Sequence, residues 1–299
     1  MVVQDERGAV PVTRKLDHII CHFGRLLKNG ATPLGYPVAV TPADSAISPP
    51  DYLSPSSIGT FQQCALKFKF SRIDGIKEPP TRATLLGNFV HDVLEEMYKL
   101  PAVDRTKDST RSIATEVFTK KDWAAQVMPY ISGDQGILQF KKDAWLCIDN
   151  LWVIEDPAVT QPTEMEARVE GEIAGVKLKG FIDRYSKSAD GTITISDYKT
   201  GKTPSPRFAD QKFFQLQVYA GLVAHMGLGN PERLELLFLE TATKFTKDVT
   251  ADVLEQTAIT VRTVRDSIES ACAKGEFATT KSNLCDWCFF KPQCPAWAD

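Results

Sequence analysis

The chain lacks the features that would place it in a membrane or outside the cell. No apolar run approaches the roughly 18 residues that a membrane-spanning helix needs, so we expect no spanning segment. The N-terminus carries Asp5, Glu6 and Arg7 where a secretion signal would have its apolar stretch. We therefore expect a cytoplasmic protein without a membrane partner.

An excess of charge of one sign is absent as well. The 35 basic and 38 acidic residues give a net charge of −3 over 299 residues. This balance excludes a protein that coats nucleic acid through bulk positive charge, but it allows a local basic groove. The sequence also has no Gly-x-x-x-x-Gly-Lys-Ser/Thr loop, so the chain itself is not expected to be a helicase.

The seven cysteines do not suit a disulfide framework, because their number is odd and the chain has no export signal. Three of them lie together near the C-terminus, as Cys285-x-x-Cys288 followed by Cys294. A Cys-x-x-Cys turn can direct two thiolates at one metal, and a third cysteine can complete one side of a tetrahedral site. A closed site needs a fourth ligand from elsewhere. Zinc, an iron–sulfur cluster and three idle thiols all remain compatible with the tail itself.

The spacing of apolar residues predicts the fold class. Residues 1–53 read as an accessory extension that ends in a proline-rich linker. Helical spacing then predicts helices over 56–70, 84–100, most of 110–155 with a break near Ser132, 208–226 and 249–273. Alternation and turn residues predict strands over 167–175, 176–185, 192–199 and 234–240, with turns at Ala174-Gly175 and Asp190-Gly191. The order indicates an α/β (α+β) domain with a mixed sheet.

Two acidic residues stand near the ends of these strands. Asp197 and Lys199 are two residues apart in a strand, so they project from one face while Tyr198 points away. If the predicted strands pair as a meander, Asp183 approaches Asp197. Two adjacent carboxylates repel each other, and a hard cation such as Mg²⁺ would offset that repulsion. A lysine beside the cation could orient a water or stabilise charge on a phosphate.

Each of these signals has an ordinary explanation when taken alone. Asp-x-Lys occurs a second time, at Asp210-x-Lys212 in a predicted helix, and a strand-end pair can be a surface salt bridge. His91 could be a core or surface histidine, and Glu166 a solvated residue at a strand edge. Gln215 and Tyr219 could be a polar stripe of an amphipathic helix. The order of these residues along the chain is what favours a site.

That order resembles the RecB-like branch of the PD-(D/E)XK nucleases. The motifs are Gly87-x-x-x-His91, Glu166, Gly180-x-Ile182-Asp183-Arg184, Asp197-Tyr198-Lys199-Thr200-Gly201 and Gln215-x-x-x-Tyr219. One upstream cysteine, Cys64, and the three in the tail also resemble the four-cysteine iron–sulfur staple of AddB-type and CRISPR-associated nucleases in this branch. The resemblance runs from about residue 54 to 297 and does not include residues 1–53.

The resemblance implies a restriction-endonuclease-like core, in which helices flank a mixed central sheet, with a helical insertion and the staple. It implies a single nuclease domain over 54–299. Within this domain we expect a helical part with the first cluster cysteine over 54–160, a catalytic core over 161–245, and a C-terminal helix and cysteine tail over 246–299.

The resemblance also implies roles for individual residues. Mg²⁺ or Mn²⁺ would be bound by His91, Asp183, Asp197 and the backbone carbonyl of Tyr198. Lys199 would be the catalytic lysine, and Gln215 and Tyr219 would contact DNA or support the site. The expected set of catalytic-site residues is Lys199, Asp183, Asp197, Gln215, Tyr219 and Glu166. A structural [4Fe–4S] cluster would be held by Cys64, Cys285, Cys288 and Cys294.

The expected activity is hydrolysis of phosphodiester bonds in DNA, acting on single strands or duplex ends, as an exonuclease on family grounds. The pathway would be DNA repair, recombination, phage replication or CRISPR adaptation, with a helicase or another repair or CRISPR protein supplied by a separate chain. Two alternatives stay open from the sequence. One is a catalytically degenerate DNA-binding or scaffold module, and the other is a zinc protein that is not a nuclease.

Overall fold

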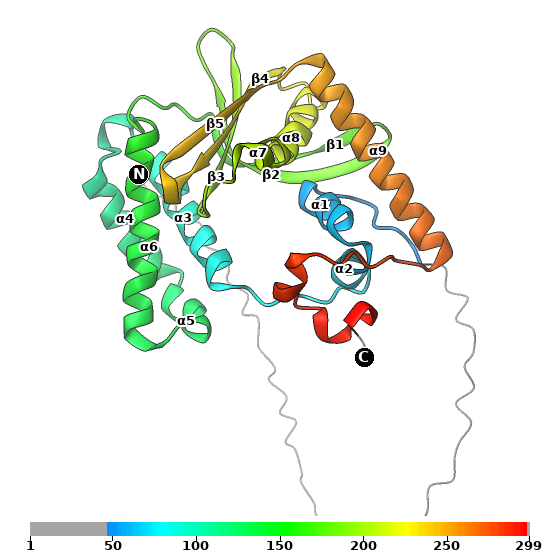
Figure 1. Cartoon of the computed structure of the whole chain (residues 1–299). Coiled ribbons are helices and arrows are strands. Elements are labelled where there is room, and N and C mark those ends of the chain that lie inside the picture. Colours follow the sequence, from blue (N-terminus) through cyan, green and yellow to red (C-terminus); the bar gives the residue numbers. More distant parts are fainter. Residues whose placement is uncertain (1–46, 298–299) are drawn as a thin grey trace, which may run out of the picture. The chain divides into compact units, whose positions relative to one another are not determined.

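A mixed sheet of five strands carries the fold (Figure 1). Its strands are β1 (Glu164–Ile173), β2 (Val176–Lys187), β3 (Ile193–Lys199), β4 (Pro231–Phe238) and β5 (Thr243–Asp248), which lie side by side in chain order. β3 and β4 are parallel, and the other neighbouring pairs are antiparallel. The computed structural model describes residues 47–297, so most of the predicted extension, residues 1–46, lies outside the described residues.

Nine α-helices surround this sheet in the described part of the chain. They are α1 (Pro55–Gln63), α2 (Ala65–Phe68), α3 (Arg82–Tyr98), α4 (Lys107–Lys120), α5 (Trp123–Val127), α6 (Gly133–Ile154), α7 (Pro206–Lys212), α8 (Phe214–His225) and α9 (Ala251–Lys274). The mixed sheet flanked by helices confirms the predicted fold class. No helix within residues 47–297 combines the length and apolar character needed to cross a membrane.

Local sequence explains several element ends. The Ser54 hydroxyl accepts the amide of Ser57 at 3.2 Å and caps α1, whose first residue is proline. Between β1 and β2, Ala174 and Gly175 both have φ in the left-handed region, at 50° and 74°. That conformation matches the twist of a two-residue hairpin, so the predicted turn is present there.

Two predicted helices are interrupted. The helix expected over 56–70 breaks at Cys64, which has extended backbone angles, and it resumes as α2 and a π-helical turn at Lys69–Ile73. Next to the break, the amide of Leu66 donates to the carbonyl of Ala278 at 3.2 Å, so a distant segment replaces a partner within the helix. The helix expected over 208–226 divides at Phe213, whose ring is buried in the core.

β5 was not predicted, and the reason lies in its position. It is an edge strand that pairs only with β4 and contains Phe245 as its one large apolar side chain. Phe245 packs edge-on against Phe238, with ring centroids 5.5 Å apart. A single apolar residue produces no alternation, so the sequence offered no strand signal there.

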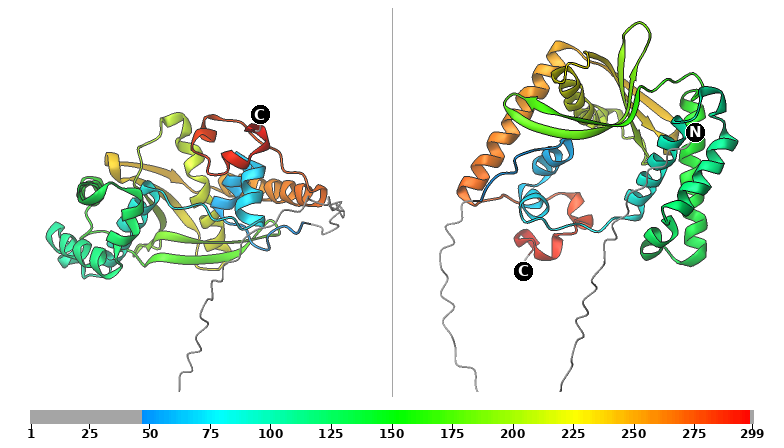
Figure 2. Two further views of the ribbon diagram at one scale, coloured as in Figure 1. Left: turned by 90° about the horizontal axis from the view of Figure 1, so that it is seen from below. Right: turned by 180° about the vertical axis from the view of Figure 1, so that it is seen from behind.

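Helices cover both faces of the sheet and create two cores (Figure 2). One core lies between the sheet and α1, α8 and α9, and it receives Ile195 and Leu236. The other lies between the opposite face and α3 to α6, and it receives Tyr198 and Leu237. Burial on both faces explains why β4 reads as a nearly continuous apolar run rather than an alternating one.

The segments at the two ends of the described chain pack onto the same unit. Leu53 is buried and forms a parallel bridge with Leu178 of β2. The C-terminal tail consists of short 3₁₀ turns between Asn283 and Trp297 and lies beside α2 (Figure 1). Its Phe290 is buried against Phe70, with ring centroids 5.3 Å apart.

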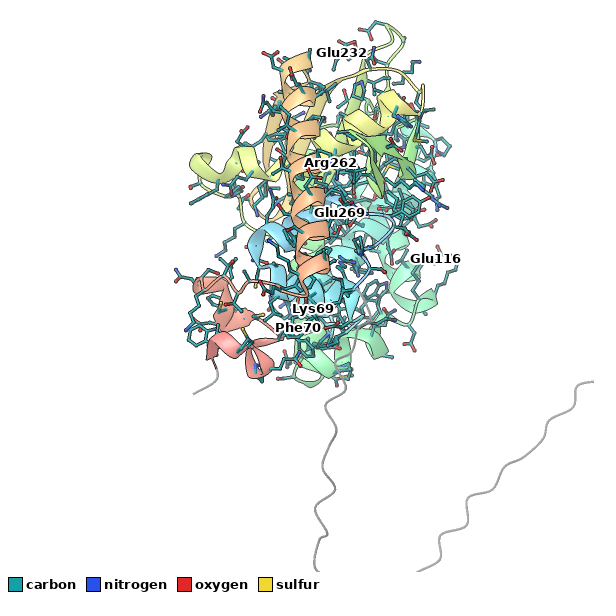
Figure 3. The ribbon with its side chains drawn as sticks, turned by 90° about the vertical axis from the view of Figure 1, so that its right-hand side faces the viewer. Lys69, Phe70, Glu116, Glu232, Arg262 and Glu269 are labelled. Atoms are coloured by element: carbon teal, nitrogen blue, oxygen red, sulfur yellow. The ribbon has the colours of Figure 1, made fainter. Side chains whose placement is uncertain are left out.

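The outer face of α9 carries charged side chains, among them Arg262 and Glu269 (Figure 3). Arg262 pairs with Asp266, one helical turn further on, and lies 3.4 Å from Glu269. Ion pairs at this spacing on an exposed face add little to stability. The packing of the opposite face of α9, through Val261, Val264 and Ile268, is therefore what holds the helix on the sheet.

Candidate metal and catalytic site

Three side chains from three elements meet at one edge of the sheet. Nδ1 of His91, on α3, lies 3.6 Å from Glu166 Oε1 on β1 and 3.6 Å from Asp183 Oδ2 on β2. The ligand atoms of all three residues lie within 4.8 Å of one another. One imidazole and two carboxylates are suitable ligands for Mg²⁺ or Mn²⁺. Three residues that are distant in sequence therefore form a group able to hold a divalent cation.

A glycine lets α3 bring His91 to this place. Gly87 lies one turn before His91, and a Cβ at residue 87 would lie 3.3 Å from the Thr200 hydroxyl, which follows β3. Such a contact is tighter than usual, so glycine permits the helix to approach the end of β3. The imidazole Nε2 then lies 3.0 Å from the backbone carbonyl of Tyr198. A backbone carbonyl on one ring nitrogen orients the other toward the carboxylates.

Asp183 lies where the ladder between β2 and β3 ends. The last pair in register is Arg184 and Ser196. Beyond this pair, the Asp183 Oδ2 accepts a hydrogen bond from the backbone amide of Tyr198 at 2.8 Å. Burial and the charge of Asp197 raise the pKa of Asp183 to about 7, although His91, the Tyr198 amide and Lys199 act in the opposite direction. The ionised Asp183 carboxylate is repelled by Asp197, and a bound cation would offset that repulsion.

His91 responds to the same surroundings. Burial by itself would lower its pKa, but the hydrogen bond to Glu166 and the charge of Asp183 prevail and raise the pKa of His91 to about 9. The Tyr198 carbonyl and the charge of Asp197 act in the same direction. The imidazole is therefore protonated at neutral pH while only protein groups surround it, and its positive charge partly balances the carboxylates.

Asp197 and Lys199 of β3 form a close pair, with Nζ 2.6 Å from Oδ2. They leave the strand on one side while Tyr198 is buried on the other, which agrees with the alternation expected for a strand. Asp197 is only 2% exposed, and within residues 47–297 its Oδ2 accepts no hydrogen bond of good geometry. A buried carboxylate oxygen that lacks a well-placed hydrogen-bond donor is suited to bind a metal ion.

The backbone at Glu166 is unusual. Its φ is +50°, in the left-handed region, although β1 pairs with β2 on either side of it through Met165 and Ala167. A left-handed residue other than glycine inside a strand costs free energy and persists only when its surroundings impose it. Such outliers concentrate at functional sites, and this one places the Glu166 carboxylate beside His91.

Gln215 and Tyr219 lie on α8 and touch each other. Gln215 Nε2 donates to the Tyr219 hydroxyl at 3.3 Å. Burial raises the pKa of Tyr219 to about 12, so the phenol stays protonated. Its ring lies directly against Gly180 of β2, where a Cβ would come within 2.5 Å of Cε1. The glycine of the Gly180-x-Ile182-Asp183 motif is thus explained by the packing of Tyr219.

Sequence reasoning missed a set of buried polar residues behind this site. Arg184, next to Asp183, is 2% exposed and bonds with groups from four elements or their ends. Its partners are Tyr98, Glu155, Ser196, Tyr198 and Glu235. The signal that could have pointed to Arg184 is a charged residue inside an apolar strand. Its partners carry no such local signal, because they come together only in the fold.

Gly201 and the second Asp-x-Lys copy both have ordinary surroundings in the structure. Gly201, the last residue of the Asp197-Tyr198-Lys199-Thr200-Gly201 motif, has a φ outside the left-handed region, and a Cβ there would meet open space. The second Asp-x-Lys copy lies on α7, where Asp210 pairs with Lys247 of β5 at 2.5 Å. The copy belongs to a helix and an ordinary surface ion pair, as expected for a chance match.

The four cysteines of the predicted staple line a single cavity of about 190 Å³. Cys64 comes from the break between α1 and α2, and Cys285, Cys288 and Cys294 come from the tail. In the described chain, no three of these thiols lie mutually within 4.8 Å. The amide of Ser282 points at the Sγ of Cys285 over 3.4 Å. The cavity is several times larger than the roughly 30 Å³ that one water occupies.

The remaining described cysteines lie elsewhere. Cys147 of α6 and Cys272 of α9 are buried in the two different cores. Burial raises the pKa of both thiols, to about 12 for Cys147. Both are therefore inert thiols within apolar packing. Cys21 lies outside the described residues.

Known proteins similar to this chain are found by sequence and by structure. Residues 52–295 match the sequence profile of the PD-(D/E)XK nuclease superfamily. The chain is 31% identical over 197 residues to the Gene 69 protein of Mycobacterium phage D29, which covers 57% of this chain and 68% of the phage protein. A crystal structure from Eubacterium rectale, of a protein provisionally named as an exonuclease, superimposes with a TM-score of 0.52 at 16% identity and covers 81% of this chain and 88% of that one. The structural similarity supports a restriction-endonuclease-like fold.

Proposed function

Because the chain belongs to the PD-(D/E)XK nuclease superfamily, we propose that it is a metal-dependent deoxyribonuclease that hydrolyses phosphodiester bonds in DNA as an exonuclease. The observation that carries this proposal is the meeting of His91, Glu166 and Asp183 beside the Asp197–Lys199 pair. A degenerate scaffold would not be expected to keep a strained Glu166 and a buried, poorly bonded Asp197 oxygen in one place.

The proposed ligands of Mg²⁺ or Mn²⁺ are His91, Asp183, Asp197 and the Tyr198 carbonyl. Glu166 joins this set, because it lies as close to His91 Nδ1 as Asp183 does. A bound divalent ion would lower the pKa of an attacking water and neutralise charge on the phosphate. The protein's own contribution is to hold these oxygens and the imidazole at fixed positions before the cation arrives.

Lys199 is the proposed catalytic lysine. Its ammonium lies 2.6 Å from Asp197, and about a third of its side chain is exposed, so it can face both the carboxylate and a substrate. A cation at this point would orient the attacking water or stabilise the negative charge that grows on the phosphate. Gln215 and Tyr219 support the site from α8, and their hydroxyl and amide groups are candidates for contact with DNA.

The proposals on pathway and partners rest on the similarities to known proteins. The RecB-like branch and the provisionally named exonuclease support action at DNA ends. Similarity to a phage protein favours phage replication or recombination among the pathways named above. We further propose that a helicase, or another repair or CRISPR protein, works with this chain as a separate polypeptide.

We also propose that Cys64, Cys285, Cys288 and Cys294 hold a structural [4Fe–4S] cluster. A single zinc ion, with Zn–S bonds of about 2.3 Å, would draw four thiolates to about 3.8 Å from one another. The wider arrangement and the size of the cavity favour a larger group. A cluster here would join residue 64 to the tail and so restrict the unfolded chain.

The function is tested by digestion of DNA labelled at one end, in single-stranded and duplex form, with Mg²⁺ or Mn²⁺ and with EDTA. We expect labelled products only with metal and only from linear DNA, with closed circular DNA left intact. An Asp183→Asn variant serves as the inactive control. Cleavage of circular DNA would show that the activity is that of an endonuclease and not of an exonuclease. DNA binding without metal-dependent cleavage would support the scaffold alternative and overturn the proposal.

A further inference from the structure

We propose that Arg184 is a positioning residue for the metal site, which it stabilises from the opposite side of the sheet through Tyr198 and α3. This inference rests on the proposed function, because it concerns how the ligands of that site are held. Arg184 follows Asp183 directly on β2. Asp183 faces His91, whereas Arg184 extends into the second core and bonds there.

The first connection runs through Tyr198. The Arg184 Nη1 donates to the Tyr198 hydroxyl at 2.8 Å, and the tyrosine is 2% exposed. The backbone of the same tyrosine touches the site twice: its amide donates to Asp183 and its carbonyl lies beside His91 Nε2. Because the side chain is enclosed and bonded at its tip, its backbone has little freedom to move. Arg184 therefore fixes two contacts of the site without touching it.

The second connection runs through α3. Arg184 Nη1 also donates to the Tyr98 hydroxyl at 3.1 Å, and Tyr98 donates to Glu155 at 2.8 Å. Tyr98 is the last residue of α3 and lies two helical turns beyond His91. The helix that delivers His91 is thus attached to the sheet at its end by Tyr98 and near its middle by the Tyr198 carbonyl.

Charge explains why an arginine is needed. Two carboxylates face its guanidinium: Nη2 lies 3.0 Å from Glu155 Oε2 and 3.3 Å from Glu235 Oε2. The Ser196 hydroxyl accepts from the same Nη2 at 3.1 Å and donates to Glu235 at 3.0 Å. Two further cations lie near this cluster: Lys244, 3.5 Å from Glu235, and Arg105, whose guanidinium carbon lies 5.2 Å from the centre of the Tyr98 ring. A planar guanidinium can serve two carboxylates and two phenols at once, whereas a lysine ammonium cannot reach them all.

Two variants test the proposal by direct measurement of metal binding. Tyr198→Phe removes the hydroxyl that Arg184 holds but leaves the backbone amide and carbonyl in place. Arg184→Lys keeps the positive charge but loses the planar guanidinium and its several N–H donors. We expect Mn²⁺ affinity, measured by isothermal titration calorimetry of the full chain, to fall about tenfold in both, which is typical when groups behind metal ligands are removed. The Mg²⁺ concentration for half-maximal cleavage should rise in parallel, with the maximal rate largely recovered at high Mg²⁺.

Lys244→Met is the matched control. It removes an ion pair with Glu235 but no contact with Tyr198 or Tyr98, so Mn²⁺ affinity should stay at the wild-type value. Should Arg184→Lys fail to fold, Tyr198→Phe decides the matter alone. Wild-type affinity in the folded variants, with an active wild type, would overturn this inference and leave the proposed function standing. A wild type that neither binds Mn²⁺ nor cleaves DNA would overturn both.

Discussion

The ring of Tyr219 on α8 lies so close to Gly180 on β2 that a Cβ at residue 180 would lie 2.5 Å from Cε1 and 2.9 Å from the hydroxyl oxygen. Real side chains do not make such contacts, so residue 180 must be glycine if Tyr219 keeps its place. Gly180 is three residues before Asp183 on the same strand. The close approach therefore joins the packing of α8 to the strand that carries an acidic residue of the site.

Substitution of this glycine should be costly. In Gly180→Ala, the added methyl must displace the Tyr219 ring from a filled core, and overpacking of this kind costs about 1–3 kcal/mol of unfolding free energy. The midpoint of urea unfolding measures the loss. Gly201→Ala is the control, because a Cβ there has open space and φ is not left-handed; it should change stability by less than about 0.5 kcal/mol. Equal midpoints for the two variants would contradict the role assigned to Gly180.

The two Asp-x-Lys copies offer a second matched comparison. Lys199→Ala should reduce the rate of DNA cleavage at least about 100-fold, because a positioned cation is lost where charge develops in the reaction. Lys212→Ala removes the lysine of the other copy, which is exposed on α7, and should leave the rate near that of the wild type. Initial rates on one linear substrate at saturating Mg²⁺ measure both effects. A fast Lys199→Ala enzyme would refute the site assignment.

The stability of the metal-free protein should fall as pH rises. The pKa of His91 is raised from 6.5 to about 9, so its protonated form stabilises the folded state fully below pH 6.5, and that contribution is lost as pH rises through 9. The pKa of Asp183 is raised from 3.8 to about 7, so folding likewise favours its protonated form and stability falls between those values. Urea midpoints in EDTA from pH 5 to 9.5 test the trend.

A His91→Gln variant should flatten the upper part of that profile, between pH 6.5 and 9, because the titrating imidazole is gone. The fall in stability that arises from Asp183 should persist and extend above pH 7, because the charge of His91 no longer lowers the pKa of Asp183. A profile that rises with pH in the wild-type protein, with EDTA present throughout, would contradict the pKa directions given for both groups.

The cysteine cavity gives a prediction about colour and folding. Anaerobically prepared wild-type protein should be brown and contain about four iron atoms per chain, as a [4Fe–4S] cluster requires. Cys285→Ser should be colourless and unfold at lower temperature, because one ligand of the centre is lost. Cys272→Ser, a buried thiol in another core, should keep the colour and iron. If the wild-type protein contains one zinc ion per chain and no iron, the four cysteines form a zinc site and the cluster proposal is wrong.

Much of the fold could be predicted because its elements carry periodic signals. The strands β1 to β3 alternate, the hairpin turn at Ala174-Gly175 has the residues that its φ values require, and α3 and α9 show regular apolar spacing. β5 could not be predicted, since an edge strand with one large apolar residue produces no pattern. The break at Cys64 could not be predicted either, because the amide of Leu66 bonds with Ala278, more than 200 residues away.

By itself, the sequence determined which residue types were available and in what order: a lysine two residues after an aspartate in a strand, a histidine on a helix, and glycines at residues 87 and 180. Only the tertiary structure decided which of them meet. His91, Glu166 and Asp183 converge because α3 packs beside β1 and β2, and Arg184 gains its partners because β2 has helices behind it. Local propensity acts between near neighbours in the chain. The distances between ligands, and the burial that raises the pKa of Asp183, arise from packing between segments far apart in it.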